Sequence, residues 1–450
     1  MVGCCKLKKT VLYCQHNTTI RKITVFGKGY NMKKTVTLFL AAVIATALLS
    51  GCSAPKITDG AIVSADEVRY LNARPYSDGL AAVKTENGWG FVDENGDFAI
   101  EPAFEAVGSF SEGLCAAITE AGEQWGYIDK SGKVVVEGQY TAAAEFSDGF
   151  ALVKRGNYYE YTDKEGNILK VTVPEKTAED GTRTEAQTLT SFSDASSFSE
   201  GIARVEIGDM SAYINTDGEI IAEGFLTSNP FSEGLCSVNF TVEKEDLNGF
   251  IDKEGKTVIE PKYLDAGNFS EGLAPFKAKI SDGTVSSSGV STGAVYAWGY
   301  LNAEGAEVIA ASYDNVYGFK NGLSRVSENI AASVYAYSFI NSDGKTVTDG
   351  TYTFAYDMTG DGLARVAKTE DKQTVWGFID KNGAEAVVPK YDNAKDFSEG
   401  YAPVCIGDKW GIIDKSGKLV VETKFDDIEA TSDGHFLVRY GDRYGFLKIV

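Results

Sequence analysis

The sequence predicts an all-β protein in which tandem repeats of roughly 34–50 residues form a β-propeller-like ring. Three observations predict this class. A five-residue motif recurs along the chain, and a second motif follows most copies of it. Apolar residues do not recur at the spacing typical of a helix. Internal repeats of this length form stacked units, because one unit cannot bury its apolar surface alone.

The recurring motif is Phe-Ser-Glu-Gly-Leu, which occurs at 110–114, 231–235 and 269–273. Serine, an acid and glycine are typical of a sharp turn, since glycine tolerates a positive φ. We expect the leading aromatic residue to pack between neighbouring units. Aligning the chain on this turn gives ten units, which begin at Tyr76, Phe110, Phe146, Phe198, Phe231, Phe269, Phe319, Thr359, Phe397 and Thr431.

The second landmark is Trp-Gly followed by Asp/Asn-x-x-Gly. Asp or Asn accepts a hydrogen bond from the backbone two residues on, and glycine closes a tight hairpin. Glycine beside tryptophan is expected to let an adjacent sheet approach closely. Five units keep the tryptophan as a structural repeat residue, and degenerate copies stand at 159–166, 211–218, 248–255 and 337–344. The five are Trp89, Trp125, Trp298, Trp376 and Trp410.

These landmarks at near-regular spacing resemble the WG-repeat family of bacterial proteins over residues 70–450. The resemblance implies the repeated β fold and little specific chemistry.

Two architectures fit the repeats: a propeller-like ring and an open superhelical β-repeat array. Strands such as Gly-Leu-Ala-Ala-Val at 79–83 are apolar on both faces, as expected for sheets packed between neighbours. The segment 70–79 matches the end of a unit, and 436–447 matches the first two strands of one. The two ends are therefore expected to complete one blade together, which favours the ring.

The N-terminal region is expected to be a targeting segment. Residues 32–51 read as a secretory signal with two lysines, an apolar run and a small-residue site. Its end, Leu49-Ser50-Gly51-Cys52, resembles the lipobox of bacterial lipoproteins, which implies lipidation of Cys52. We expect translation to start at Met32, with 1–31 an unstructured upstream extension, 52–69 a linker and first strand, and 70–450 the repeat domain. The predicted location is outside the cytoplasm, with a lipid anchor in the cell membrane.

Charge and cysteine content exclude several functions. The chain has 43 basic and 64 acidic residues, and eight of the basic residues but none of the acidic ones lie before Cys52. The remainder, with a formal net charge of −29, repels nucleic acid. Cys115 and Cys236 hold equivalent positions in separate units, so we expect buried thiols rather than a disulfide. No Cys/His cluster is present, so neither a metal site nor a cofactor is predicted.

No catalytic constellation is recognisable, and the protein is predicted not to be an enzyme. The one histidine after Cys52, His435, is expected at the surface, and no Ser-His-Asp set can be built. A carboxylate-pair glycan hydrolase is the third hypothesis. The turn acids recur at one position and are interpreted as solvated turn formers, the alternative being a carboxylate row that binds cations or a basic partner. They are Asp78, Glu112, Asp148, Glu200, Glu233, Glu271, Asp361, Glu399 and Asp433.

The candidate binding surface lies where four consecutive units lengthen. The expanded loops are expected at 239–248, 277–297, 327–337 and 368–375, on one face, with Tyr296, Tyr335 and Tyr337 as contact residues. A further insertion at 171–191 follows the third strand of another unit. The leading hypothesis is a protein-binding scaffold in the cell envelope. The alternative is a module that binds cell-wall polysaccharide.

Overall fold

The computed structural model describes residues 11–16, 19–24, 64–65, 69–119, 123–177, 183–226, 229–283, 293–331, 334–348, 352–431 and 434–449. The chain divides into two units, Met1–Ala54 and Pro55–Val450. In the first unit, β1 (Val11–His16) and β2 (Thr19–Thr24) pair as an antiparallel hairpin. This differs from the absence of structure expected for residues 1–31, and the β-branched residues of both segments favour strands. The signal segment 32–51 and Cys52 lie outside the described residues.

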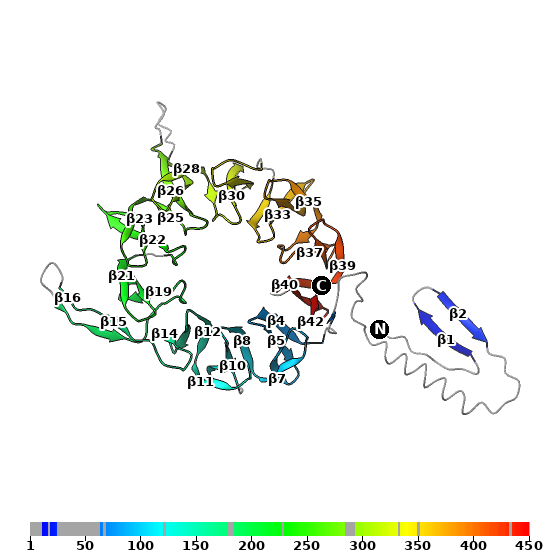
Figure 1. Ribbon diagram of the computed structural model, residues 1–450. Coiled ribbons are helices and arrows are strands. Elements are labelled where there is room, and N and C mark those ends of the chain that lie inside the picture. The colour runs from blue at the N-terminus through cyan, green and yellow to red at the C-terminus, as the bar shows by residue number, and fades with distance from the viewer. Residues whose placement is uncertain are drawn as a thin grey trace. The chain divides into compact units, whose positions relative to one another are not determined.

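Ten of the antiparallel sheets in the described part of the second unit, here called blades 1 to 10 in chain order, follow one another round a ring (Figure 1). Within a blade the chain moves from the inner side of the ring to the outer side (Figure 1). The innermost strands are β4 (Asn72–Ser77), β8 (Ala106–Ser111), β12 (Ala142–Ser147), β25 (Asp265–Ala266), β29 (Asn315–Val316), β32 (Phe354–Met358), β36 (Asn393–Ala394) and β40 (Asp427–Ala430).

The strand after the turn carries the Gly-Leu-Ala-x-Val segment or a variant of it, and it is the second strand of every blade except blades 4 and 5, where it is the first. These strands are β5 (Leu80–Thr85), β9 (Leu114–Ile118), β13 (Phe150–Arg155), β19 (Ile202–Ile207), β22 (Leu235–Val242), β26 (Leu273–Ser281), β30 (Leu323–Ala331), β33 (Leu363–Glu370), β37 (Tyr401–Ile406) and β41 (His435–Tyr440).

The next strand, here called the third strand in every blade, carries the Trp-Gly landmark or its degenerate copy. These strands are β6 (Gly88–Val92), β10 (Trp125–Asp129), β14 (Tyr158–Thr162), β20 (Met210–Asn215), β23 (Glu245–Asp252), β27 (Val295–Asn302), β31 (Val334–Asn341), β34 (Gln373–Asp380), β38 (Lys409–Asp414) and β42 (Arg443–Lys448). The outer strands are β7 (Phe98–Phe104), β11 (Val134–Tyr140), β21 (Ile220–Phe225), β24 (Thr257–Tyr263), β28 (Glu307–Tyr313), β35 (Glu385–Tyr391), β39 (Leu419–Phe425) and, in blade 10, β3 (Ser64–Ala65).

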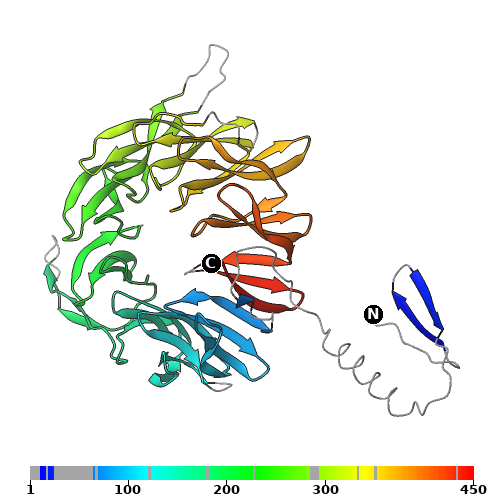
Figure 2. The same cartoon turned by 45° about the vertical axis from the view of Figure 1, so that its right-hand side comes forward.

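Blade 10 is completed by the two ends of the repeat region. β3 pairs antiparallel with β42, with Ser64 opposite Lys448 and Ala65 opposite Leu447. The predicted joint blade is therefore present, but its N-terminal part is 64–65 and not 70–79. Residues 72–77 instead form β4, because the segment before each turn pairs with the strand that follows the turn. The red blade 10 lies beside the blue blade 1 in both views (Figures 1 and 2).

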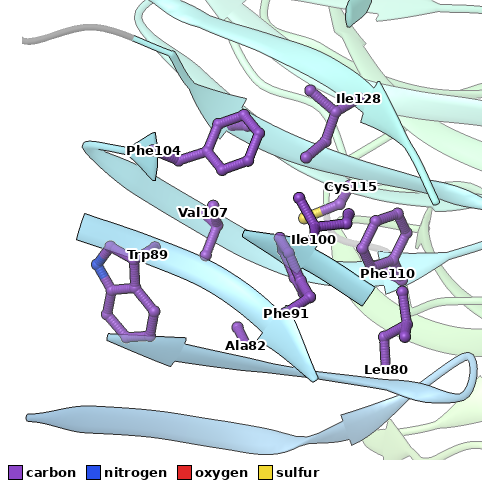
Figure 3. Close-up of a cluster of buried hydrophobic side chains, with 11 residues drawn as sticks. Leu80, Ala82, Trp89, Phe91, Ile100, Phe104, Val107, Phe110, Cys115 and Ile128 are labelled. Atoms are coloured by element: carbon purple, nitrogen blue, oxygen red, sulfur yellow. The ribbon is translucent and has the colours of Figure 1, made fainter. Parts of the chain in front are cut away.

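The hydrophobic core lies between blades, and consecutive blades share one cluster at each of the ten interfaces. Between blades 1 and 2, Phe91, Ile100 and Val107 are among the buried side chains (Figure 3). The interface between blades 10 and 1 has its own cluster, in which Tyr76 packs with Phe446. The ring is therefore closed by apolar packing as well as by strand pairing.

The leading aromatic residue of the turn packs on the preceding blade, as predicted. Phe110 meets Phe91 with ring centroids 4.8 Å apart, and Phe397 meets Phe378 at 4.6 Å. Both pairs are edge-to-face, which favours aromatic contacts beyond the burial of area. The partner follows directly after the Trp-Gly pair in the third strand, so the two landmarks together build each interface.

The glycine of Trp-Gly lets a strand, and not an adjacent sheet, approach closely. A Cβ at Gly90 would lie 2.6 Å from the Ile100 carbonyl oxygen, and one at Gly377 would lie 2.4 Å from that of Val387. Both oxygens belong to the outer strand of the same blade. The register shifts there, since Trp376 faces Tyr391 whereas Phe378 faces Val387. The expectation about a neighbouring sheet is wrong, because this bulge brings the outer strand across the glycine.

The insertion at 171–191 forms a hairpin arm beside blade 3. β15 (Val171–Val173) pairs with β18 (Gln187–Leu189), and β16 (Lys176–Thr177) pairs with β17 (Arg183–Thr184). At its base the Thr172 amide donates to the Gly218 carbonyl of blade 4 at 2.9 Å. The arm therefore extends from the position of an outer strand.

Candidate functional site

One face of the ring carries the serine-acid-glycine turns, and these turns bond to one another. The Ser77 hydroxyl donates to the Phe110 carbonyl at 2.7 Å, and the Gly113 amide donates to the Asp78 carboxylate at 2.8 Å. The same serine bond recurs from Ser111, Ser147, Ser232 and Ser270 to the turn of the next blade. The recurring turn thus links blades 1, 2, 3, 5 and 6 to their successors.

The turn acids act in these links. Lys130 of blade 2 lies 2.8 Å from Asp78 of blade 1. This bond holds the pKa of Asp78 below its ordinary value. The Gly113 amide lowers the pKa further, whereas partial burial raises it. Glu112, Asp148, Glu200, Glu233, Glu271 and Asp361 also accept amide bonds from the next turn. Asp433 lies outside the described residues.

The opposite face carries the hairpins that join second and third strands, because successive connections in an antiparallel sheet alternate between its two ends. Of the four lengthened segments predicted as loops, three are mostly paired strand, namely 239–248, 327–337 and 368–375. β22–β23 and β33–β34 extend to two-residue turns at Glu243-Lys244 and Asp371-Lys372, all with positive φ. Their alternating side chains favour strand extension. As predicted, the lengthened segments lie on one face.

Blades 6 and 7 expose isoleucine at matching places on this face. The pairing of β26 with β27 shifts between Lys279 and Ser281, and that of β30 with β31 shifts between Asn329 and Ala331. The residues at the shifts are Ile280, 51% exposed, and Ile330, 65% exposed. A bulge redirects the side chain of its extra residue. The adjacent hairpins also expose Val295 and Val334.

Of the three tyrosines expected on this surface, Tyr296 is exposed, at 46%, and lies opposite Lys279. Tyr335 and Tyr337 are half-buried. The Tyr337 amide donates to the Tyr352 carbonyl at 2.9 Å, which pairs this part of β31 with the outer edge of its own blade. The isoleucines were missed by sequence reasoning. Their apolar character inside polar hairpin segments is the signal that could have found them.

The five repeat tryptophans lie on third strands opposite an aromatic residue of the outer strand. Trp89 faces Phe104, Trp125 faces Tyr140, Trp298 faces Tyr313, Trp376 faces Tyr391 and Trp410 faces Phe425. Trp89 is buried and the other four are half-buried. Cross-strand aromatic pairs stabilise a sheet, so these residues belong to the framework of the ring and not to the exposed hairpin surface.

His435 is buried, and the expectation of a surface residue is wrong. Its ring lies 4.4 Å from the ring of Tyr76. Its Nε2 lies 3.3 Å from the Glu94 carbonyl oxygen. The residue holds the position that leucine takes after most turns, and this position faces the next blade. The sequence of the turn alone does not show that His435 lies at the interface between blades 10 and 1.

Cys115 and Cys236 are buried, as predicted. Cys115 and Cys236 are free and almost fully covered, and Cys405 is also buried. Burial raises the pKa of Cys115 to about 12, so its thiolate is scarce at neutral pH.

In the part of the chain that the structure describes, no group of three or more His, Cys, Asp or Glu residues is arranged to hold a metal ion. Within the same residues, no helix is both long and apolar enough to cross a membrane.

Comparison with solved structures gives distant likenesses. A eukaryotic initiation factor is 11% identical with a TM-score of 0.43, over 76% of this chain and 95% of its own. The WD40 domain of SCAP from fission yeast is 10% identical with a TM-score of 0.30, over 88% of this chain and 97% of its own. A comparison with curated proteins finds no match.

The family model of the WG containing repeat matches eight segments, which together span more than half of the chain. They are 89–120, 125–159, 191–210, 249–279, 298–329, 337–371, 376–410 and 410–444. Each segment carries the third strand and hairpin glycine that build a blade, or part of that pattern. The chain therefore belongs to the WG-repeat family.

Proposed function

We propose that the ring is a non-catalytic scaffold that binds a protein partner through the extended hairpins of blades 5 to 8. The observation that carries this proposal is the matching pair of bulges that expose Ile280 and Ile330 on neighbouring blades. Exposed apolar side chains on adjacent hairpins offer the apolar centre that protein interfaces use, and the polar strand residues around them supply a rim.

The proposal places the ring outside the cytoplasm, held to the membrane by a lipid on Cys52. The lipobox-like sequence Leu49-Ser50-Gly51-Cys52 supports it. The Cys52→Ser variant is expected to leave the membrane fraction, because without its lipid the protein loses the anchor. The measurement is the distribution of protein between membrane and soluble fractions of cells. An unchanged distribution would remove the lipid anchor from the account.

The test of the binding surface is site-specific photocrosslinking in intact cells. A photoreactive residue at Ile330 or Tyr296 is expected to give one defined protein adduct. The matched control is the same residue at Tyr158, which is 58% exposed at the start of the third strand of the unextended blade 3. The double variant Ile280→Ser, Ile330→Ser is expected to lose the adduct from Tyr296 while keeping its unfolding temperature. Equal adducts from all three positions would contradict the proposal.

Polysaccharide binding is the second candidate, supported by the exposed Tyr296, because an aromatic face can pack on a sugar ring. It is tested by co-sedimentation of the protein with cell-wall sacculi stripped of protein. Sedimentation that free glycan competes away, and that Tyr296→Ala abolishes, would favour this candidate over the protein partner.

A further inference from the structure

One blade interface departs from the linkage of turns described above. The turn of blade 7 reads Phe319-Lys320-Asn321-Gly322-Leu323, so an amide stands where other blades have a carboxylate. Asn321 has the same left-handed backbone conformation as the acids at this position of other turns, with a φ of 51°. Its side-chain nitrogen donates to the Met358 carbonyl at 3.3 Å. The turn therefore keeps its shape and loses its negative charge.

The lysine that ordinarily meets this carboxylate is nevertheless present. Five blades place a lysine directly after the Asp of their Asp-x-x-Gly turn, and four of these lysines pair with the turn acid of the preceding blade. The pairs are Lys130–Asp78 at 2.8 Å, Lys164–Glu112 at 3.1 Å, Lys253–Glu200 at 3.1 Å and Lys415–Asp361 at 2.8 Å. The fifth lysine is Lys381 of blade 8, which is exposed and follows the blade that carries Asn321. Among the described residues, Lys381 forms no ion pair.

A cavity of about 410 Å³ opens beside this lysine. Asn321, Lys345, Lys381 and Asn382 are among its lining residues. The nearby Asp380 carboxylate is engaged in its own turn, where it accepts the amides of Asn382 and Ala384 at 2.8 and 3.0 Å. The cavity thus gathers two lysines and amide groups.

A second cavity, of about 360 Å³, is also lined by Asn321 and differs in the pairing of its charges. Its cations Lys320 and Arg325 lie 3.4 and 2.8 Å from the Asp357 carboxylate. Both cations therefore have an ion-pair partner within the protein. The lysines of the first cavity, Lys345 and Lys381, form no ion pair among the described residues, which marks it as the place for an anion.

We propose that the cavity between blades 7 and 8 binds a carboxylate group of a ligand. The ligand's carboxylate takes the place that the turn acid has in the other blades. Lys381 forms the ion pair, and Lys345 and the second N–H of the Asn321 amide donate hydrogen bonds. The shared chemistry fits a small dicarboxylic acid or the acidic side chain of a peptide. The site lies on the turn face and does not depend on the hairpin surface proposed above.

The test is isothermal titration of the full chain with glutarate and, separately, with an end-blocked triglutamate peptide. Glutaramide serves as the uncharged control and inorganic phosphate as the other anion. One carboxylate probe is expected to bind saturably at low salt. Binding of glutarate alone identifies a small dicarboxylate as the source, and binding of the peptide alone identifies a protein side chain. Binding of neither probe, or equal binding of phosphate, would overturn the proposal.

Two variants assign the site. Asn321→Asp is isosteric and gives blade 7 the residue that blades 1, 3 and 8 have at this position, so folding is retained. Its carboxylate is expected to occupy Lys381 and to weaken probe binding at least about tenfold. Lys381→Gln is expected to have the same effect. The matched control Lys130→Gln, at an interface that has its own acid, is expected to leave affinity unchanged. Wild-type affinity in both Asn321→Asp and Lys381→Gln would contradict the assignment.

Discussion

The glycine that follows tryptophan in the repeat has no room for a side chain. In blade 8 a Cβ at Gly377 would meet the backbone of Val387 and of Pro389. Neither group can move without displacing the outer strand. At Gly360 of the same blade, a Cβ would meet nothing within 4 Å, and no positive φ is present.

Gly377→Ala is therefore expected to lower the free energy of unfolding by about 1–3 kcal/mol, because the added methyl group forces the outer strand away. Gly360→Ala is expected to change it by less than about 0.5 kcal/mol. Urea denaturation of both variants measures the difference. Equal effects would show that the close approach of the outer strand does not constrain Gly377.

The turn acids give the fold a pH dependence that can be measured at one residue. The pKa of Asp78 is lower in the folded protein than its ordinary value of 3.8, chiefly through the bond from Lys130. Its contribution to stability is therefore fully present above that value and is lost as the pH falls through the folded pKa.

Asp78→Asn is expected to be less stable than the wild type by about 1 kcal/mol or less near neutral pH, since the pair is partly exposed. This difference is expected to persist down to about pH 5 and to shrink below about pH 4. Denaturation curves from pH 7 to pH 3 test it. Asp209→Asn is the control, because Asp209 forms no hydrogen bond or ion pair of its side chain among the described residues. A difference that grows on acidification would contradict the assignment.

At the scale of elements, the sequence predicted the framework better than the connections. The aromatic anchors and the Asp-x-x-Gly hairpins follow from local chemistry, and Asp93 indeed accepts the amide two residues on, at 2.9 Å. The lengthened hairpins were expected as loops, because Glu243-Lys244 and Asp371-Lys372 are not recognisable turn residues. Their positive φ is imposed by pairing of the long flanking strands, which a local reading does not see.

This mismatch gives a prediction about blade 8. Replacing Asp371-Lys372 with Asn-Gly is expected to raise the free energy of unfolding by about 1 kcal/mol, because both positions have left-handed backbone that side chains disfavour. Lys372→Ala keeps a Cβ at this position and is expected to give no comparable gain. Thermal and urea unfolding of both variants measure this. Destabilisation by Asn-Gly would show that the original side chains make contacts that outweigh the backbone strain.

At the scale of the whole molecule, function depends on closure. A ring fixes the order of the blades and therefore places the bulged hairpins of blades 6 and 7 side by side on one face and the Asn321 cavity on the other. The ten units could be counted from the sequence. A first strand was expected within 52–69, but its pairing with β42 to complete blade 10 could not be predicted, since the two-residue segment Ser64–Ala65 carries no repeat signal.

Closure is tested most directly by a disulfide between the paired ends, in the double variant Ser64→Cys, Lys448→Cys. These residues are opposite one another in the β3–β42 pair, at a spacing that a disulfide spans, whereas the native Cys115, Cys236 and Cys405 are buried. The account predicts near-complete intramolecular crosslinking of the monomer under mild oxidation, and none when Lys262→Cys, in blade 5, replaces the second cysteine. Free thiols, or disulfide-linked dimers alone, would show that the ends do not meet and would contradict the closed ring.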